Sequence, residues 1–299
     1  MKLGYIGLGK MGLGMVERLL ERRHTTVVYD ADEKVMQQIV WKGAAMARSP
    51  WNLIEMLERP RLIWLMVPHE AVDGVLKDIV PLLHDGDTVI DGGNSFYKDS
   101  VARHAELSKR YINFLDAGVS GGPEGAREGA CVMVGGSKDV FNKYEELFRD
   151  IAAENAYAYV GSSGAGHFAK MIHNGIEYGM MQSLAEGFNI LKNSPYELDV
   201  ARLASLYNNR SVIESRLVGW LAEAYKTYGA DLDEVSGSAA SSGEGGWTVE
   251  TAKELGLETL VIEAAVEFRK QSQANPSYIG KVLTALRGVF GGHEVSSKQ

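Results

Sequence analysis

Four side chains able to exchange protons or make hydrogen bonds recur at helical spacing in AKMIHNGIEYG, residues 169–179. They stand at positions i, i+3, i+4 and i+7 and are Lys170, His173, Asn174 and Glu177. If the segment is helical, this spacing places all four on one face. A lysine and a glutamate on that face could act as base and acid toward a bound substrate. A solvated helix face would show the same pattern, so the rest of the chain must distinguish the two.

The composition is that of a globular protein, and the net charge limits the classes of partner that it could bind. The 299 residues, 45% of them hydrophobic and 23% charged, suggest two domains or one large one with a sizeable core. A net charge of −8 argues against a nucleic-acid partner. No apolar run approaches the ~18 residues of a membrane span, and the N-terminus lacks the features of a signal peptide. We therefore expect no membrane partner and a cytoplasmic location.

The single cysteine, Cys131, cannot form an internal disulfide, which fits a reducing compartment. It lies in the apolar run ACVMVGG, residues 130–136, so we expect it to fill the core. Histidines, cysteines and acidic residues do not cluster at metal-ligand spacing, so no metal site is expected.

The elements that would position the polar row fall into two halves. The first half alternates short apolar runs with amphipathic stretches such as 11–22 and 139–152, which is typical of parallel βαβ units. The expected strands are Lys2–Ile6, Thr26–Tyr29, Leu62–Val67, Thr88–Asp91 and Phe114–Ala117, followed by 130–136 and 156–161.

From Ala165 onward the strand signals stop and helical patterns take over. We expect one long helix over 165–192, further helical segments at 196–226, 248–272 and 278–288, and an ordered small-residue loop at 236–247. The predicted fold is an α/β Rossmann domain with a doubly wound, mostly parallel sheet at 1–163. An all-α substrate and dimerisation domain with a C-terminal tail is predicted at 164–299.

A glycine-rich turn predicts a dinucleotide site at the start of the chain. Gly7, Gly9 and Gly12 form G-x-G-x-x-G between a strand and a helix, with Leu8 and Met11 in the same loop. These glycines would allow the tight turn, the approach of a pyrophosphate to the backbone, and close packing of helix on strand. The start of the helix would present free N–H groups to the phosphates.

Asp30 predicts which dinucleotide is preferred. It ends the second strand about 20 residues past the glycines, where an acid binds the ribose hydroxyls. Its carboxylate would repel a 2′-phosphate, and the neighbouring Asp32 and Glu33 would not neutralise one. NAD is therefore favoured, with NADP a weaker alternative. Asp30 could instead merely cap the next helix.

Further loops follow the carboxyl ends of later strands, where ligands of open parallel sheets bind. LMVPHEAV ends the third long strand and supplies Val67 to the cofactor site, and IDGGNS ends the fourth and supplies Asn94 to cofactor or substrate. After the fifth strand, Ser120, Gly121 and Gly122 offer a hydroxyl and backbone N–H groups suited to a carboxylate or hydroxyl.

Several of these motifs resemble a known family. The glycine loop, VSGG at 119–122 and a lysine on a long helix together resemble the β-hydroxyacid dehydrogenases. GAGHFAKMIHNGIEYGMMQ at 164–182, DGGNS, GGWT at 245–248 and LRGVFGGH at 286–293 are more specifically similar to the decarboxylating 6-phosphogluconate dehydrogenases. The similarity extends over nearly the whole chain. Because the second half of the longer members' helical domain is missing, it points to their short, often NAD-preferring branch.

The resemblance implies a chemical role for each member of the row. Lys170 would take the proton of a substrate C3 hydroxyl as hydride leaves C3, and would later donate to the carbonyl oxygen during loss of CO2. For the first step it must be neutral part of the time, which desolvation in a closed cleft would favour. Glu177 would protonate C1 of the enediol. Asn174 would hold the C3 hydroxyl or carboxylate, and His173 would bind substrate hydroxyls.

The same resemblance implies a phosphate pocket and a shared site. Its residues would be Tyr178, Arg269, Arg287 and His293, with the tail donated across a homodimer or homotetramer. Arginine suits bidentate phosphate binding, although these arginines could also be plain surface charges. Longer members carry a lysine in the loop before the tryptophan, and here Ser242 or Glu244 stands around that point.

The sequence thus predicts oxidative decarboxylation of 6-phosphogluconate, with no metal because Lys170 would polarise the carbonyl itself. Two alternatives stay open. A non-decarboxylating 3-hydroxyacid dehydrogenase would keep Lys170 and Asn174 but would not need Glu177. A non-catalytic NAD-binding sensor would need none of the three.

Overall fold

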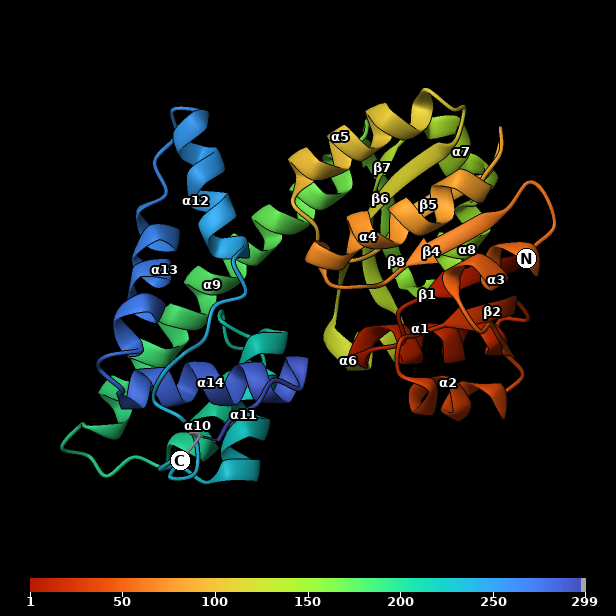
Figure 1. Cartoon of the computed structure of the whole chain (residues 1–299). Helices are drawn as coiled ribbons and strands as arrows, with labels where there is room; N and C mark the ends of the chain where they lie inside the picture. Colours follow the sequence, from red (N-terminus) through yellow and green to blue (C-terminus); the bar gives the residue numbers. More distant parts are fainter. Residues whose placement is uncertain (297–299) are drawn as a thin grey trace. The chain divides into compact units, whose positions relative to one another are not determined.

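The computed structural model of the chain describes residues 1–296 and separates into two compact units, Met1–Met171 and a second one from Ile172 onward. In the first unit an eight-stranded sheet has the order β3-β2-β1-β4-β5-β6-β7-β8 (Figure 1). Neighbouring strands are parallel except for β6 and β7, which are antiparallel. The strands are β1 (Lys2–Ile6), β2 (Thr25–Tyr29), β3 (Ala45–Met46), β4 (Leu62–Leu65), β5 (Thr88–Asp91), β6 (Asn113–Ser120), β7 (Ala130–Gly136) and β8 (Ala152–Gly161).

Helices cover both faces of this sheet, and each face has its own hydrophobic core. One core joins the sheet to α1, α2, α7 and α8, with Leu19 and Phe148 at its centre. The other joins it to α3, α4 and α5, with Leu53 and Val72 at its centre. Strands buried on both faces read as continuous apolar runs, as LIWL in β4 does. The helices are α1 (Lys10–Glu21), α2 (Glu33–Val40), α3 (Pro50–Glu55), α4 (His69–Ile79), a 3₁₀ turn η1 (Val80–Leu82), α5 (Tyr97–Ser108), α6 (Gly122–Glu128), α7 (Lys138–Lys143) and α8 (Glu145–Ile151).

The second unit is helical, and α9 runs from the end of the first unit into it. Its main core gathers apolar side chains of α9, α10, α11 and α14, including Phe188, Leu221 and Leu283. A smaller cluster packs Tyr178 of α9 against Val249 of α12 and Val266 of α13. The helices are α9 (Ala165–Lys192), α10 (Val200–Tyr207), α11 (Arg216–Tyr228), α12 (Glu244–Glu254), α13 (Leu260–Ser272) and α14 (Tyr278–Gly291).

The predicted fold class is confirmed, while several predicted element bounds are wrong. The segment 196–226 is two helices, because Asn208 ends α10 and the Ser215 side chain caps α11 by accepting from the Val218 N–H. The segment 248–272 is also two helices, and α12 begins at Glu244, inside the predicted loop. The segment 139–152 divides into α7 and α8, and β8 starts earlier than predicted, at Ala152.

Cys131 was expected in the core, and this is wrong. Its side chain is exposed, while Ala130 and Val132 on either side are buried. Alternate residues of a strand face opposite sides, so the apolar run ACVMVGG does not bury every member. None of the helices in residues 1–296 is both long and apolar enough to cross a membrane.

Candidate active site

The glycine loop between β1 and α1 is built as a dinucleotide site requires. Gly7 has a φ of +99°, and a Cβ there would lie 2.3 Å from the Met66 carbonyl oxygen. A Cβ on Gly12 would lie 2.1 Å from the Gly7 carbonyl oxygen, so both positions exclude a side chain. Gly9 caps α1 without any side-chain hydrogen bond, and a Cβ there would meet nothing within 4 Å. The open space over Gly9 fits a pyrophosphate at the start of the helix.

Asp30 lies against this loop. Its Oδ2 accepts from the Leu8 N–H at 2.6 Å, and its Oδ1 accepts from the Asp32 N–H at 2.9 Å. The α2 helix is capped by Asp32, which accepts from the Lys34 N–H at 2.9 Å, so capping is not the role of Asp30. Each carboxylate oxygen keeps a further lone pair, which leaves Asp30 able to accept from a ribose hydroxyl.

The other predicted cofactor residues lie around the same loop or one strand further. Val67 is close to Gly7, since a Cβ on that glycine would lie 2.9 Å from Val67 Cγ1. The Leu8 side chain is buried and Met11 is half-buried. Asn94 is exposed in a loop anchored by Asp91, whose carboxylate accepts from the Gly93 N–H, the Ser95 hydroxyl and the Arg103 guanidinium.

Replacing Asp30 should change the preference between the two dinucleotides. In Asp30→Ala the affinity for NAD should fall about tenfold, because charge-assisted hydrogen bonds to the ribose are lost. The affinity for NADP should fall less or rise, because the 2′-phosphate is no longer repelled. Steady-state KM values for both dinucleotides measure the change, and Asp30→Asn separates loss of charge from loss of the contact with the Leu8 N–H. An unchanged NAD/NADP ratio in both variants would remove Asp30 from this role.

Lys170 is held in place by β6. Asp116, fully buried in that strand, accepts from the Gly164 N–H at 2.7 Å and from the His167 N–H at 2.9 Å. It therefore caps the first turn of α9 from a distant part of the sequence. A Cβ on Gly118 would lie 2.4 Å from the Lys170 Cβ, so only glycine lets strand and helix approach this closely. Ser120 ends β6, Gly121 is the N-cap of α6 and Gly122 its first residue, and all three are half-buried.

Further along α9, the remaining members of the row contact one another. His173 Nδ1 lies 3.0 Å from Asn174 Oδ1 and 3.8 Å from Glu177 Oε2. All three residues are half-buried, as is Lys170. The row is therefore neither part of the core nor an open surface, which suits side chains that must meet a substrate.

Two buried arginines lie on α13 and α14, and the first of them contacts α9. Arg269 on α13 is 3% exposed, and its guanidinium carbon lies 3.5 Å from the centre of the Tyr178 ring. Its hydrogen bonds are long: Nη1 donates to the Ala240 carbonyl at 3.4 Å and Nη2 to Met181 Sδ at 3.6 Å. Arg287 on α14 is 8% exposed. Within residues 1–296, neither guanidinium is ion-paired with a carboxylate.

The two arginines are close enough for the charge of one to act on the other. Burial lowers the pKa of Arg269, and the charge of Arg287 lowers it further, whereas Tyr178, Glu177 and Glu244 act in the opposite direction. Burying a guanidinium without a paired anion is unfavourable. Their interpretation as surface charges is therefore wrong, and of the neighbouring pair Arg269 and Lys270 only the arginine points inward.

The other predicted members of the phosphate pocket differ in placement. The Tyr178 hydroxyl lies 3.2 Å from Ser241 Oγ and accepts from the Ser242 N–H at 3.4 Å, so it ties the loop before α12 to α9. His293 is exposed, and its ring lies against Gly291, where a Cβ would be 2.6 Å from His293 Cδ2.

Comparison with known proteins identifies the family. Residues 2–161 match the NAD binding domain of 6-phosphogluconate dehydrogenase, and residues 166–284 match the C-terminal domain of that enzyme. The chain belongs to the 6-phosphogluconate dehydrogenase family. It is thus an oxidoreductase with a domain for a nicotinamide dinucleotide, as predicted.

Individual relatives agree with this assignment. YqeC of Bacillus subtilis strain 168 is 46% identical over 298 residues, covering all of both chains. The NAD(+)-dependent, decarboxylating 6-phosphogluconate dehydrogenase of Haloferax volcanii is 38% identical and covers 100% of this chain and 99% of that one. The structure of the Plasmodium falciparum 6-phosphogluconate dehydrogenase has a TM-score of 0.81 and 28% identity, covering 96% of this chain and 70% of that one. That protein was solved with NADP+ and with 6-phosphogluconate.

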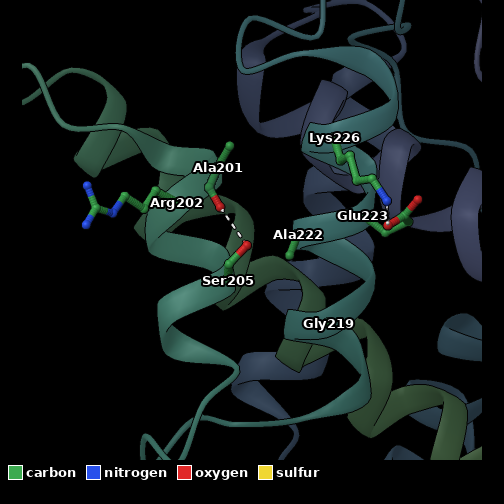
Figure 2. Close-up of a pocket in the computed structure, with 7 residues that line it drawn as sticks. All are labelled: Ala201, Arg202, Ser205, Gly219, Ala222, Glu223 and Lys226. Atoms are coloured by element: carbon green, nitrogen blue, oxygen red, sulfur yellow. Dashed lines mark hydrogen bonds and ion pairs between the residues drawn. The ribbon is translucent and has the colours of Figure 1, made fainter.

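A groove between α10 and α11 is a separate feature of the second unit (Figure 2). In it, Lys226 pairs with Glu223 at 3.4 Å and the Ser205 hydroxyl donates to the Ala201 carbonyl at 3.2 Å. None of the predicted site residues lines it. No group of three or more potential metal-ligating side chains occurs among the described residues.

Sequence reasoning missed Asp116 and His167. The His167 side chain is 1% exposed, with Nδ1 2.7 Å from the Ser100 hydroxyl and Nε2 buried without a hydrogen-bond partner in residues 1–296. The spacing of neither residue from others in the sequence signals its role, because their partners are far away in the sequence. Only an acid directly after an apolar run, as in FLDAG, hinted at Asp116.

Proposed function

We propose that the protein converts 6-phospho-D-gluconate to ribulose 5-phosphate and CO2 while reducing NAD, with NADP as a poorer substitute. The observation that carries the proposal is the pair of buried arginines, Arg269 and Arg287, without a carboxylate partner in the described residues. A small 3-hydroxy acid without phosphate would not need them. They suit a phosphate ester, because guanidinium groups bind phosphate bidentately.

In the proposed reaction, Lys170 transfers a proton in two separate steps. The neutral amine takes the proton of the C3 hydroxyl while the C3 hydrogen leaves as hydride, and bound NAD supplies the acceptor for that hydride. The resulting 3-keto acid loses CO2 from C1, and the electron pair of the broken bond moves toward the C3 oxygen. The ammonium form of Lys170 then donates to that oxygen and stabilises its charge. Asn174 hydrogen-bonds the C3 hydroxyl or the carboxylate throughout.

Glu177 completes the reaction by protonating the carbon that lost CO2. It lies two turns from Lys170 along α9, about 10 Å by helix geometry, so the two groups address different atoms of an extended sugar acid. His173 Nδ1 is 3.8 Å from Glu177 Oε2, close enough to help orient it. His173 otherwise positions substrate hydroxyls.

Removing the acid of Glu177 should slow the last proton transfer. In Glu177→Gln we expect kcat to fall about a hundredfold, the usual contribution of a general acid. Exchange of the C1 hydrogen of ribulose 5-phosphate with deuterated water, followed by NMR, should be lost. Glu186→Gln, an exposed position on the same helix, is the matched control. Normal exchange in Glu177→Gln would assign the proton transfer to another group.

The overall proposal is tested with purified protein and NAD, offered 6-phosphogluconate, gluconate or 3-hydroxyisobutyrate. Equal amounts of NADH and CO2 from the phosphorylated acid are expected. NADH without CO2, or activity on the small acid alone, would favour a plain 3-hydroxyacid dehydrogenase. NADH from none of the three would favour a dinucleotide-binding protein without chemistry.

The protein is also proposed to act as a homodimer or homotetramer. Ile176 and Met180 on α9 and Leu260 and Val261 on α13 are exposed apolar residues, 54%, 43%, 73% and 64% accessible respectively. The two helices meet here, because a Cβ on Gly179 would lie 3.1 Å from Val261 Cγ1. Contiguous exposed apolar surface of this kind is typical of an interface. A monomer by light scattering at micromolar concentration would contradict this.

A further inference from the structure

A buried glutamate lies near Arg269. Glu244, the first residue of α12, is 6% exposed. It is one of the two residues standing around the point where longer family members carry a lysine. If Arg269 and Arg287 bind a phosphate ester as proposed, a carboxylate near Arg269 would oppose the binding of that anion.

Several contacts fasten the start of α12 to Tyr178 and Arg269. A Cβ on Gly245 would lie 2.7 Å from the Tyr178 ring, which in turn stacks on the Arg269 guanidinium. The Ala240 carbonyl accepts from Arg269, and the Ser242 N–H donates to the Tyr178 hydroxyl. The loop and the helix start therefore form one wall around the guanidinium, and Glu244 is buried in that wall.

The charge of Glu244 acts on Arg269. The pKa of Arg269 is lowered chiefly by burial, and Glu244 is among the groups that oppose this shift. The pair is not a contact ion pair, since Arg269 makes no salt bridge with a carboxylate in residues 1–296. Glu244 thus offsets part of the positive charge without a contact ion pair, and the guanidinium N–H groups that do not donate to Ala240 or Met181 stay available to a ligand.

We infer that Glu244 is a specificity-determining residue, which lowers the affinity of the Arg269–Arg287 pocket for a phosphate dianion and so reduces the preference for phosphorylated over unphosphorylated sugar acids. The inference rests on the proposed function for its substrate class. The effect of Glu244 on affinity is electrostatic, because a carboxylate near a partly desolvated anion site opposes a second negative charge.

The test uses the near-isosteric Glu244→Gln variant and inorganic phosphate as the probe. We expect the dissociation constant for phosphate, measured by calorimetry, to fall about tenfold. The ratio of kcat/KM for 6-phosphogluconate to that for gluconate should rise about tenfold, with kcat for 6-phosphogluconate changed less than threefold. A phosphate dissociation constant that is unchanged or higher would overturn the inference.

Controls separate this result from misfolding and from failure of the proposed reaction. Glu250→Gln, an exposed acid on α12, should leave phosphate binding unchanged. If Glu244→Gln does not melt cooperatively, Glu244→Thr provides the same charge removal and the same expectation. Tighter phosphate binding without turnover of any sugar acid would support the role of Glu244 and reject the proposed function. Turnover of 6-phosphogluconate with unaltered phosphate binding would support the proposed function and reject the role of Glu244.

Discussion

Replacing Lys170 by methionine should reduce turnover of 6-phosphogluconate by about 10³–10⁴-fold while leaving NAD binding intact. In the proposed mechanism, Lys170 acts as the base for the C3 hydroxyl and then as the acid that stabilises the charge on the C3 oxygen. Losing one such proton-transfer group typically costs 10²–10⁴-fold, and here both steps depend on the same side chain. Methionine keeps an unbranched, flexible side chain but can neither accept nor donate this proton.

The structure makes this variant informative, because its effect on folding should be small. Lys170 is half-buried, and what fixes its backbone is the Asp116 cap together with the close approach at Gly118. NADH binding, followed by fluorescence, should stay within threefold of the parent protein. Lys138→Met, at an exposed lysine at the start of α7, controls for loss of a charge. More than a tenth of the parent activity in Lys170→Met would refute the mechanism.

Features that depend on neighbours along the chain were predictable from sequence. The glycine loop needs only a strand, a tight turn and a helix start within a dozen residues, and the polar row of α9 needs only helical periodicity. The division of 196–226 also had a local signal, since the polar run NNRS and the capping Ser215 lie between α10 and α11. The helical periodicity on both sides of that run nevertheless led to the prediction of a single helical segment.

Features that depend on distant neighbours were not predictable. The carboxylate of Asp116 meets the start of α9 across 48 to 51 positions of sequence. The burial of Arg269 and Arg287 results from packing among α9, α12, α13 and α14, and no property of those segments alone signals it. Cys131 was predicted to be buried and is exposed. Which face of a strand is buried depends on the layer that packs on it, and the strand sequence alone does not give this.

Asp116→Ala should be the most destabilising of the substitutions considered, lowering the free energy of unfolding by about 3 kcal/mol. Asp116 is fully buried and satisfies the N–H groups of Gly164 and His167 at 2.7 and 2.9 Å. A buried donor left without an acceptor costs about 1–3 kcal/mol, and Asp116→Ala leaves two such donors. The carboxylate also lies at the positive end of the α9 dipole, which favours its charge.

Asp116→Ala should also lower the rate of the reaction, because Lys170 lies one turn beyond His167 on α9. We expect kcat to fall more than the KM for NAD changes, because the fault lies in the position of the lysine and not in the glycine loop. Asp116→Asn keeps an acceptor oxygen in place and should recover part of both stability and kcat, whereas Asp139→Ala, at an exposed acid on α7, should alter neither. Urea unfolding and steady-state kinetics measure the two effects. If Asp116→Ala lowered stability but left kcat unchanged, the cap would stabilise the fold without positioning Lys170, and the lysine would owe its place to the contact at Gly118 alone.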